Sequence, residues 1–251
     1  GKLINEGRVT VNGFVPEMGT KVVHGDKVKV DGKTILNDSK KRTYIAFNKP
    51  IGIVCTTDTG VEKNNIIDYI NYPIRIFPIG RLDKDSEGLI LLTDDGDIVN
   101  KILRASNNHE KEYIVTVNRP ITDRFIERMA NGIPILDTVT RKCKVEQVSK
   151  FVFRIILTQG LNRQIRRMCE YLDYEVTKLK RTRIMNVELG YLQTGDWREL
   201  TEEEMKEINT MISTSSKTAE ASSIKKNTKK LVSKKKSAPS KNDFNKKYVI
   251  T

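Results

Sequence analysis

Residues 77–93 read FPIGRLDKDSEGLILLT, a polar loop that leads directly into a short apolar run. The run from Gly88 to Thr93 predicts one buried strand, and residues 94–104 after it predict a helix. A carboxylate such as Asp83, on a loop that enters a rigid sheet, suits acid, base or nucleophilic chemistry. By composition alone, however, most loops of this kind are solvated turns.

The segments around this loop mix strands and helices without a regular alternation of the two. Apolar and polar residues alternate along 111–117, which predicts a strand. Thr122 or Asp123 caps a helix that ends at Asn131-Gly132, and a capping-box pattern at Thr201–Glu204 predicts a last helix. The other expected strands are 43–47, 141–148 and 151–157. We therefore predict an α+β fold with a largely antiparallel sheet.

Residues 162–172 predict an amphipathic helix with a cationic start, for which Asn162 is the expected cap. A cation in the first turns is disfavoured by about 0.3–1 kcal/mol, so we expect an anion nearby, a phosphate or a carboxylate. A solvated basic face is the competing interpretation. Basic residues at 178–183 favour contact with a nucleic-acid backbone. The apolar face holds Ile165, Met168, Cys169 and Leu172, and the basic face holds Arg163, Arg166 and Arg167.

The chain divides into three parts by composition. Residues 1–40 predict a helix end, a few short strands and a linker, a unit so small that we expect one or two helices upstream of it. Residues 41–212 hold the strands and helices described above. Residues 213–251 contain eleven lysines and two acids, and this composition predicts a disordered basic tail.

The net charge of +13 indicates a polyanionic partner, and the tail holds nine of these charges. The tail is either a non-specific tether to a polyanion or a solubility segment. No apolar run approaches the ~18 residues of a membrane span. Three scattered cysteines indicate a reducing compartment, and with the two histidines they form no zinc-ligand pattern.

Four motifs occur in order along the chain: Gly80–Asp83, Lys111–Tyr113, Leu157–Met168 and Lys180–Ile184. Together they resemble the RsuA-like family of ribosomal RNA pseudouridine synthases, and the likeness extends over residues 1–212. Residues 78–117 look most like members that act on large-subunit ribosomal RNA. The front unit resembles the back half of an RNA-binding module of the ribosomal protein S-four type.

The resemblance implies a pseudouridine synthase fold, with a mixed, largely antiparallel sheet and a central cleft. It implies an enzyme that isomerises a specific uridine to pseudouridine without a cofactor or a metal. The expected substrate is large-subunit ribosomal RNA, with tRNA as a further possibility, and we expect a cytoplasmic monomer. The alternatives are a non-catalytic RNA-binding or ribosome-assembly protein on the same fold, and a general nucleic-acid binder driven by the tail.

The same resemblance assigns roles to individual residues. Asp83 is the expected catalytic carboxylate, and Tyr113 is expected to stack on the base and help to remove the proton from carbon 5. Arg166 is expected to pair with Asp83 and to keep it ionised. Arg81 would fill the space left by a flipped uridine, and Leu179 would pack against the base. The expected RNA contacts are Arg81, Lys111, Arg163, Arg167, Lys180, Arg181 and Arg183.

Overall fold

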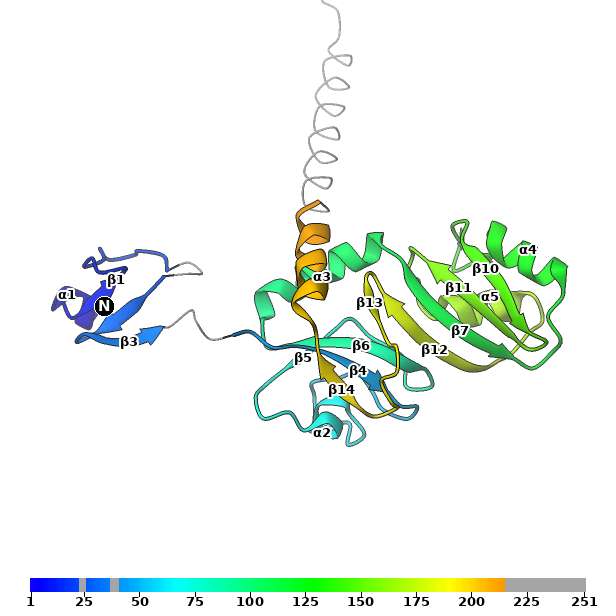
Figure 1. Ribbon diagram of the computed structural model, residues 1–251, viewed down its shortest axis with the longest axis horizontal. Helices are drawn as coiled ribbons and strands as arrows, with labels where there is room; N and C mark the ends of the chain where they lie inside the picture. The colour runs from blue at the N-terminus through cyan, green and yellow to red at the C-terminus, as the bar shows by residue number, and fades with distance from the viewer. Residues whose placement is uncertain (23–25, 37–40, 215–251) are drawn as a thin grey trace, which may run out of the picture.

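The computed structural model describes residues 1–22, 26–36 and 41–214 of the chain. The predicted linker residues 37–40 and nearly all of the predicted tail lie outside these ranges. Three sheets are described: a small one near the N-terminus, a large one that carries most of the fold, and a two-stranded pair (Figure 1).

The small sheet follows α1 (Lys2–Asn5) and has three antiparallel strands in the order β1-β2-β3. The strands are β1 (Val9–Val11), β2 (Val28–Val30) and β3 (Lys33–Leu36). The first two were predicted, and β3 was not. An Asp31–Arg8 ion pair of 2.6 Å links the turn before β3 to the residue before β1. Figure 1 shows this unit apart from the large sheet.

The large sheet has nine strands, seven of which follow the order β10-β11-β7-β12-β6-β4-β14, while β5 pairs with β6 and β13 with β12. Only β12 and β6 run parallel among these pairs, so the prediction of a mixed, largely antiparallel sheet is confirmed. The strands are β4 (Tyr44–Lys49), β5 (Phe77–Ile79), β6 (Glu87–Thr93), β7 (Lys111–Val117), β10 (Lys144–Ser149), β11 (Val152–Leu157), β12 (Val176–Ile184), β13 (Val187–Glu188) and β14 (Trp197–Glu199). A separate two-stranded pair joins β8 (Pro134–Ile135) to β9 (Thr138–Val139).

Helices cover both faces of the β6-β4 half of the sheet. Leu89 and Leu91 of β6 pack against α3 (Gly96–Asn108) and against Ile208 of the helical residues 202–214. The intervening residues of β6 pack against α2 (Ile66–Ile70) on the other side (Figure 1). Burial on both faces explains why β6 is an almost continuous apolar run and does not alternate.

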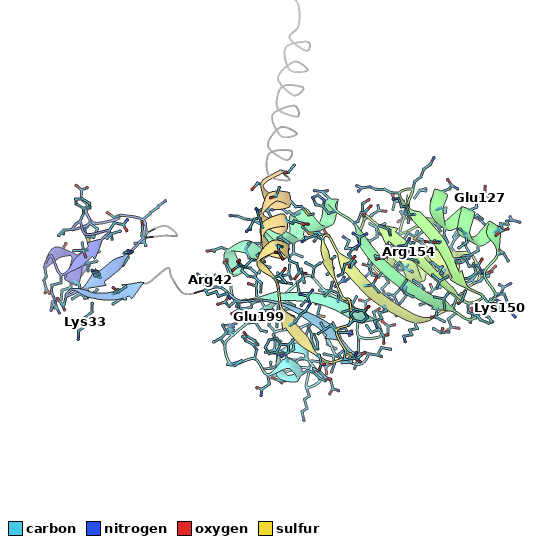
Figure 2. The ribbon with its side chains drawn as sticks, in the orientation of Figure 1. Lys33, Arg42, Glu127, Lys150, Arg154 and Glu199 are labelled. Atoms are coloured by element: carbon cyan, nitrogen blue, oxygen red, sulfur yellow. The ribbon has the colours of Figure 1, made fainter. Side chains whose placement is uncertain are left out.

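The other half, β10-β11-β7-β12, is covered on one face by α4 (Asp123–Asn131) and α5 (Gln164–Tyr171). Phe125 and Met129 of α4 and Met168 of α5 belong to the core of this half. The opposite face carries charged side chains such as Glu112 of β7 and Arg154 of β11, the second of which is labelled in Figure 2.

A glycine of β6 lies where the two halves of the sheet meet. Gly88 of β6 pairs with Arg181 of β12 at the parallel contact, with φ at +108°. A Cβ at Gly88 would overlap the backbone of Arg181. Because only glycine has no Cβ and tolerates this φ, it allows β6 and β12 to approach here.

Two predicted caps are confirmed. The Thr122 hydroxyl accepts a hydrogen bond from the Phe125 amide at 3.1 Å and starts α4. Thr201 and Glu204 form the reciprocal capping box, with distances of 3.1 Å and 2.9 Å. The expected helix over 94–104 is observed as α3 but begins at Gly96 and runs on to Asn108, with Asp95 as its cap.

Candidate active site

A cavity of about 450 Å³ opens beside the parallel contact of β6 and β12. This volume is typical of small-molecule sites, which span ~300–1,000 Å³. Eight of the eleven residues singled out in the sequence line it: Arg81, Asp83, Lys111, Tyr113, Arg163, Arg166, Leu179 and Arg181. The other three, Arg167, Lys180 and Arg183, do not. The tertiary structure therefore brings all three expected catalytic residues to one site.

The loop between β5 and β6 presents Asp83 to this cavity. Leu82 is buried among α2 and β4 residues and anchors the loop, so its neighbours Arg81 and Asp83 project from a fixed point. The Ser86 amide donates to the Asp83 carbonyl at 3.0 Å, which closes the loop into a turn before β6. The Asp83 carboxylate therefore sits on a short loop held by the sheet, as the sequence predicted.

Arg163 and Arg166, at the start of α5, contact this loop in an unexpected way. Arg163 Nη1 lies 3.3 Å from Asp83 Oδ2, and the same guanidinium makes a bidentate pair with Asp85 at 3.1 Å and 2.9 Å. Arg166 Nη2 donates to the Asp85 carbonyl at 3.0 Å and to the Ser86 hydroxyl at 3.1 Å. The prediction that Arg166 pairs with Asp83 is therefore wrong for this structure, because Arg163 forms that pair.

The conformation at the start of α5 explains why Arg163, and not Arg166, pairs with Asp83. Arg163, and not Asn162, is the N-terminal cap residue, with left-handed φ and ψ of 48° and 37°. Arg167 Nε donates to the Asn162 carbonyl at 3.0 Å and its Nη2 to the Asn162 side chain at 2.9 Å. Arg167 is thus bound to its own helix start, and its expected contact with phosphate stays a prediction. The predicted anion is present as two carboxylates, which offset the unfavourable helix dipole.

Asp85 is a site residue that the sequence reasoning missed. Arg163 is the main cause that keeps the pKa of the Asp85 carboxyl below its ordinary value, and Arg166 adds to the effect. Arg166 Nη1 also lies 3.5 Å from Asp85 Oδ2. A second acid two residues after Asp83 was the available signal, because both can face the same arginine helix.

Tyr113 and Leu179 form an apolar wall of the cavity. They lie on neighbouring strands, where Tyr113 of β7 pairs with Arg181 of β12 and Leu179 pairs with Val115. Leu179 is buried and Tyr113 packs against the same core cluster. A flat ring next to an aliphatic side chain is suited to hold a planar ligand between them.

Lys111 and Arg181, two of the expected RNA contacts, are buried. Lys111 Nζ donates to the Ser106 carbonyl at 2.8 Å, and Arg181 Nε donates to the Leu89 carbonyl at 2.8 Å. Burial, with a smaller contribution from Arg181, lowers the pKa of Lys111 to about 8. Both side chains line the cavity, and their expected contact with RNA stays a prediction.

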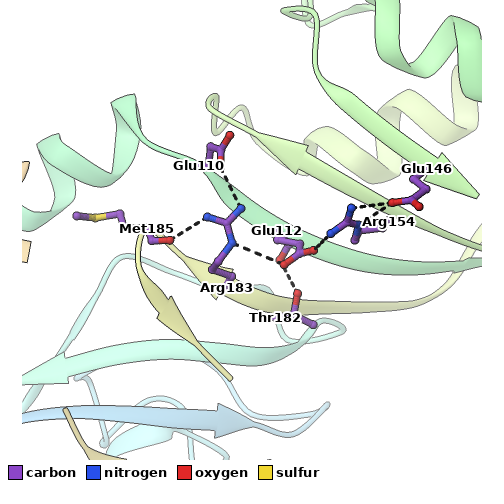
Figure 3. Close-up of polar contacts among 7 residues, drawn as sticks. All are labelled: Glu110, Glu112, Glu146, Arg154, Thr182, Arg183 and Met185. Atoms are coloured by element: carbon purple, nitrogen blue, oxygen red, sulfur yellow. Dashed lines mark hydrogen bonds and ion pairs between the residues drawn. The ribbon is translucent and has the colours of Figure 1, made fainter. Parts of the chain in front are cut away.

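Arg183 lies on the opposite face of the sheet, in a charged network that crosses four strands (Figure 3). It pairs with Glu110 at 3.1 Å and with Glu112 at 3.7 Å, and Glu112 also pairs with Arg154. Arg154 continues the network to Glu146. Arg183 is therefore neutralised by carboxylates, and its expected contact with RNA stays a prediction. Lys180 lies on the same strand, and its expected RNA contact stays a prediction.

Lys49 is a second residue that the sequence did not indicate. It ends β4 fully buried, and Nζ donates to the carbonyls of Pro50 and Ile53 at 2.9 Å and 2.8 Å. Burial lowers the pKa of this amine, against the opposing attraction of Asp85 and Asp83. These two hydrogen bonds therefore hold the loop after β4 against the end of that strand.

The sequence family described as RNA pseudouridylate synthase matches residues 43–171, which is more than half of the chain. The chain belongs to this family. Its members are RNA pseudouridine synthases, enzymes that isomerise uridine in RNA, and the matched range contains Asp83, Tyr113 and Arg166. The α+β fold and the enzyme class expected from the motifs are confirmed.

Several relatives carry the same family name. The chain is 58% identical over 219 residues to the dual-specificity RNA pseudouridine synthase RluF of Salmonella typhi, covering 87% of this chain and 75% of that protein. It is 34% identical to the ribosomal large subunit pseudouridine synthase B of Bacillus subtilis, covering 84% and 88% of the two chains. A crystal structure of a pseudouridylate synthase superposes with a TM-score of 0.62 at 29% identity, over 82% and 91% of the two chains.

Within residues 1–22, 26–36 and 41–214, no three His, Cys, Asp or Glu side chains gather as candidate metal ligands. In the same part of the chain, no helix has the length and apolar character to cross a membrane.

Proposed function

We propose that this pseudouridine synthase uses Asp83 as its catalytic carboxylate and Tyr113 as the residue that stacks on the target uracil. The observation that supports this most strongly is that both line one cavity, with Arg163 on the carboxylate of Asp83. Asp83 attacks the nucleoside or takes part in its proton transfer, and Tyr113 helps to remove the proton from carbon 5. Leu179 packs against the other face of the base.

Arg166 has a direct role in this proposal, although it does not pair with Asp83. Its Nη2 is held by the Asp85 carbonyl and the Ser86 hydroxyl, which fixes the guanidinium beside the catalytic loop. Its Nε is buried and has no hydrogen-bond partner among the residues that the structure describes. A buried donor without a partner costs free energy, so this N–H is available to a substrate oxygen.

Arg81 lies exposed at the rim of the same cavity. A uridine must leave its stack to reach an enclosed pocket, and the gap that it leaves in the RNA is filled by a side chain in many base-flipping enzymes. Arg81 precedes the anchored Leu82 and lines the cavity, whereas Lys84 of the same loop does not, so we assign it this role.

The proposed substrate is large-subunit ribosomal RNA, with tRNA as a second substrate. The likeness to a large-subunit enzyme and to relatives named dual-specificity supports two RNA classes. Residues 1–40 would dock RNA as part of an S-four-type module, residues 41–212 would form the catalytic domain, and the tail would tether RNA. A cytoplasmic monomer agrees with the three free cysteines, and sedimentation of the purified chain tests the oligomeric state.

The test is the release of tritium from RNA that is labelled at carbon 5 of uridine. We expect the wild-type chain to release tritium from 23S-type ribosomal RNA and from tRNA, and Asp83→Asn to release none above background. Asp97→Asn is the matched control, since Asp97 is an exposed acid in the first turn of α3 and should leave the rate unchanged.

Two outcomes would overturn the proposal. Full activity of Asp83→Asn would show that another group is the catalytic carboxylate. A folded wild-type chain that binds both RNA classes tightly and releases no tritium would favour the non-catalytic RNA-binding alternative.

A further inference from the structure

Two cations of the cavity wall, Lys111 and Arg181, have no assigned part in the proposed reaction. The side chains of Lys111 and Arg181 come from the neighbouring strands β7 and β12 and are only 7% and 6% exposed. Their hydrogen bonds go to backbone carbonyls: Lys111 to Ser106, and Arg181 to Leu89 and Arg81. Neither forms an ion pair with a carboxylate of the described residues.

The other cations of the cavity are compensated. Arg163 and Arg166 contact the carboxylates of the Asp83 loop, and Arg81 is exposed to water. Asp83 is the single acid among the residues that line the cavity. Removing an unpaired charge from water costs several kcal/mol even after relaxation. Lys111 and Arg181 therefore leave an excess of positive charge inside the cavity, where water does not screen it.

We propose that Lys111 and Arg181 form a cationic site for the uracil anion that separates from ribose during isomerisation. This inference rests on the proposed function of the cavity and adds a binding role for the leaving group. The excess charge calls for an anion, and the substrate supplies one only in the course of the reaction, because a bound uridine base is neutral. Phosphates of the RNA stay at the rim with the backbone.

The placement of the two strands supports this role. Residues two apart in a strand face the same side, so Lys111 and Tyr113 both face the cavity from β7. Arg181 is the direct partner of Tyr113 on β12. A base stacked on Tyr113 would therefore lie close to both cations. Gly160 lines the cavity, and an ideal Cβ built on it would lie 3.9 Å from Lys111 Nζ. The ammonium of Lys111 therefore lies beside this part of the cavity wall.

The step balances without any other reactant. The C1′–N1 bond breaks and its electron pair stays on uracil, where it spreads over N1, O2 and O4, while the Asp83 carboxylate bonds to or stabilises the electron-deficient C1′. Lys111 Nζ donates a hydrogen bond to one of these oxygens and keeps its proton, and Arg181 adds a fixed positive charge. After the base turns, carbon 5 bonds to C1′ and Asp83 is released, the carbon 5 proton passes to water with the help of Tyr113, and N1 takes up a proton from water.

An interaction with an anion that forms only in the reaction acts on the rate and not on binding. We therefore expect Lys111→Met to lower the single-turnover rate constant at saturating RNA by about 10²–10³-fold, with Kd unchanged. Lys111→Arg keeps the charge and should recover part of the rate. Lys101→Met, at an exposed lysine of α3, is the matched control and should leave the rate unchanged.

A second RNA substrate distinguishes stabilisation of the uracil anion by Lys111 from a purely structural role of this residue. Fluorine at carbon 5 stabilises the uracil anion, so RNA with 5-fluorouridine at the target position depends less on the cations. Loss of 5-fluorouridine is followed by chromatography, because this base has no carbon 5 proton to release. We expect Lys111→Met to slow the reaction of 5-fluorouridine clearly less than that of uridine, and Lys111→Gln to behave in the same way.

Three results would overturn the inference. Equal slowing of both substrates by Lys111→Met and Lys111→Gln would indicate a structural role. A loss confined to Kd would indicate a phosphate contact, and an unchanged rate would show that Lys111 is not needed. Each of these is read against an active wild type and an inactive Asp83→Asn, so failure of the inference is distinct from failure of the proposed function.

Discussion

The guanidinium of Arg163 lies 3.3 Å from the carboxylate of Asp83, and it reaches this position from a left-handed residue that starts α5. A non-glycine residue in this conformation costs of order 1 kcal/mol. The bidentate contact with Asp85 helps to hold it there, so the arginine is shared by two acids of one loop. The helix start and the catalytic loop therefore position each other.

Arg163→Ala should reduce the rate without unfolding the chain. The change removes the ion pair from Asp83, whereas exposed pairs of this kind contribute only about 0–1 kcal/mol to stability. We expect the single-turnover rate of tritium release to fall by about 10–100-fold, because a positioned charge next to the reacting group is lost. Arg163→Lys should not restore it fully, since an ammonium cannot make the forked contact with both acids. A rate equal to wild type would contradict this prediction.

Asp85→Asn should change how the free energy of unfolding depends on pH. Arg163 lowers the pKa of Asp85 in the folded chain, so its stabilising effect is present above the ordinary pKa of an aspartate and is lost as the pH falls through the lowered value. The difference in the free energy of unfolding between wild type and Asp85→Asn should therefore shrink between pH 5 and pH 2. Asp97→Asn serves as the control. A difference that stays constant with pH would show that the charge of Asp85 is not the cause.

Gly88→Ala should be strongly destabilising. The new Cβ meets the backbone of Arg181, which cannot move without separating β6 from β12, and the positive φ adds strain. We expect a loss of roughly 4 kcal/mol or more in the free energy of unfolding. Gly96→Ala is the matched control, because nothing lies within 4 Å of its Cβ position and it sits in the first turn of α3. Denaturant titration measures both, and similar midpoints for the two variants would refute the role of Gly88.

Lys111 should make the chain more stable as the pH rises through the alkaline range. Its pKa is about 8 in the folded chain and 10.5 as the ordinary value, so the unfolded chain binds more protons between these limits. Wild type should gain roughly 3 kcal/mol relative to Lys111→Met between pH 8 and pH 10.5. Parallel pH profiles for the two proteins would contradict this. Lys101→Met should follow wild type.

Removal of residues 215–251 should weaken the dependence of RNA affinity on salt. The eleven lysines of this segment lie outside the described residues, and their charge alone carries the prediction. Each phosphate neutralised on a single strand contributes about 0.7 to the slope of log affinity against log salt. We expect a shallower slope with the single-turnover rate retained at saturating RNA. Full-length protein with glutamine at these lysines should behave like the truncated chain, and an unchanged slope would reject a tether.

Local patterns were sufficient for much of the fold. The apolar run of β6, the alternation of β7 and the caps at Thr122 and Thr201 all depend on neighbouring residues, and all are observed. Short elements such as α2, β5 and β3 were not predicted, since a few residues carry too little periodicity. The motifs likewise indicated Asp83, Tyr113 and Arg166, and the structure places these together.

The sequence by itself determined which side chains serve the site and that α5 needs an anion, because composition, spacing and the helix dipole are properties of one segment. Only the tertiary structure decided that Arg163, and not Arg166, meets Asp83, since that choice depends on the backbone turn at Arg163 and on the unforeseen pull of Asp85. It also decided where three similar cations lie. Lys111, Arg181 and Arg183 look alike in the sequence, but strand pairing buries the first two in the cavity and turns Arg183 towards Glu110 and Glu112 on the opposite face.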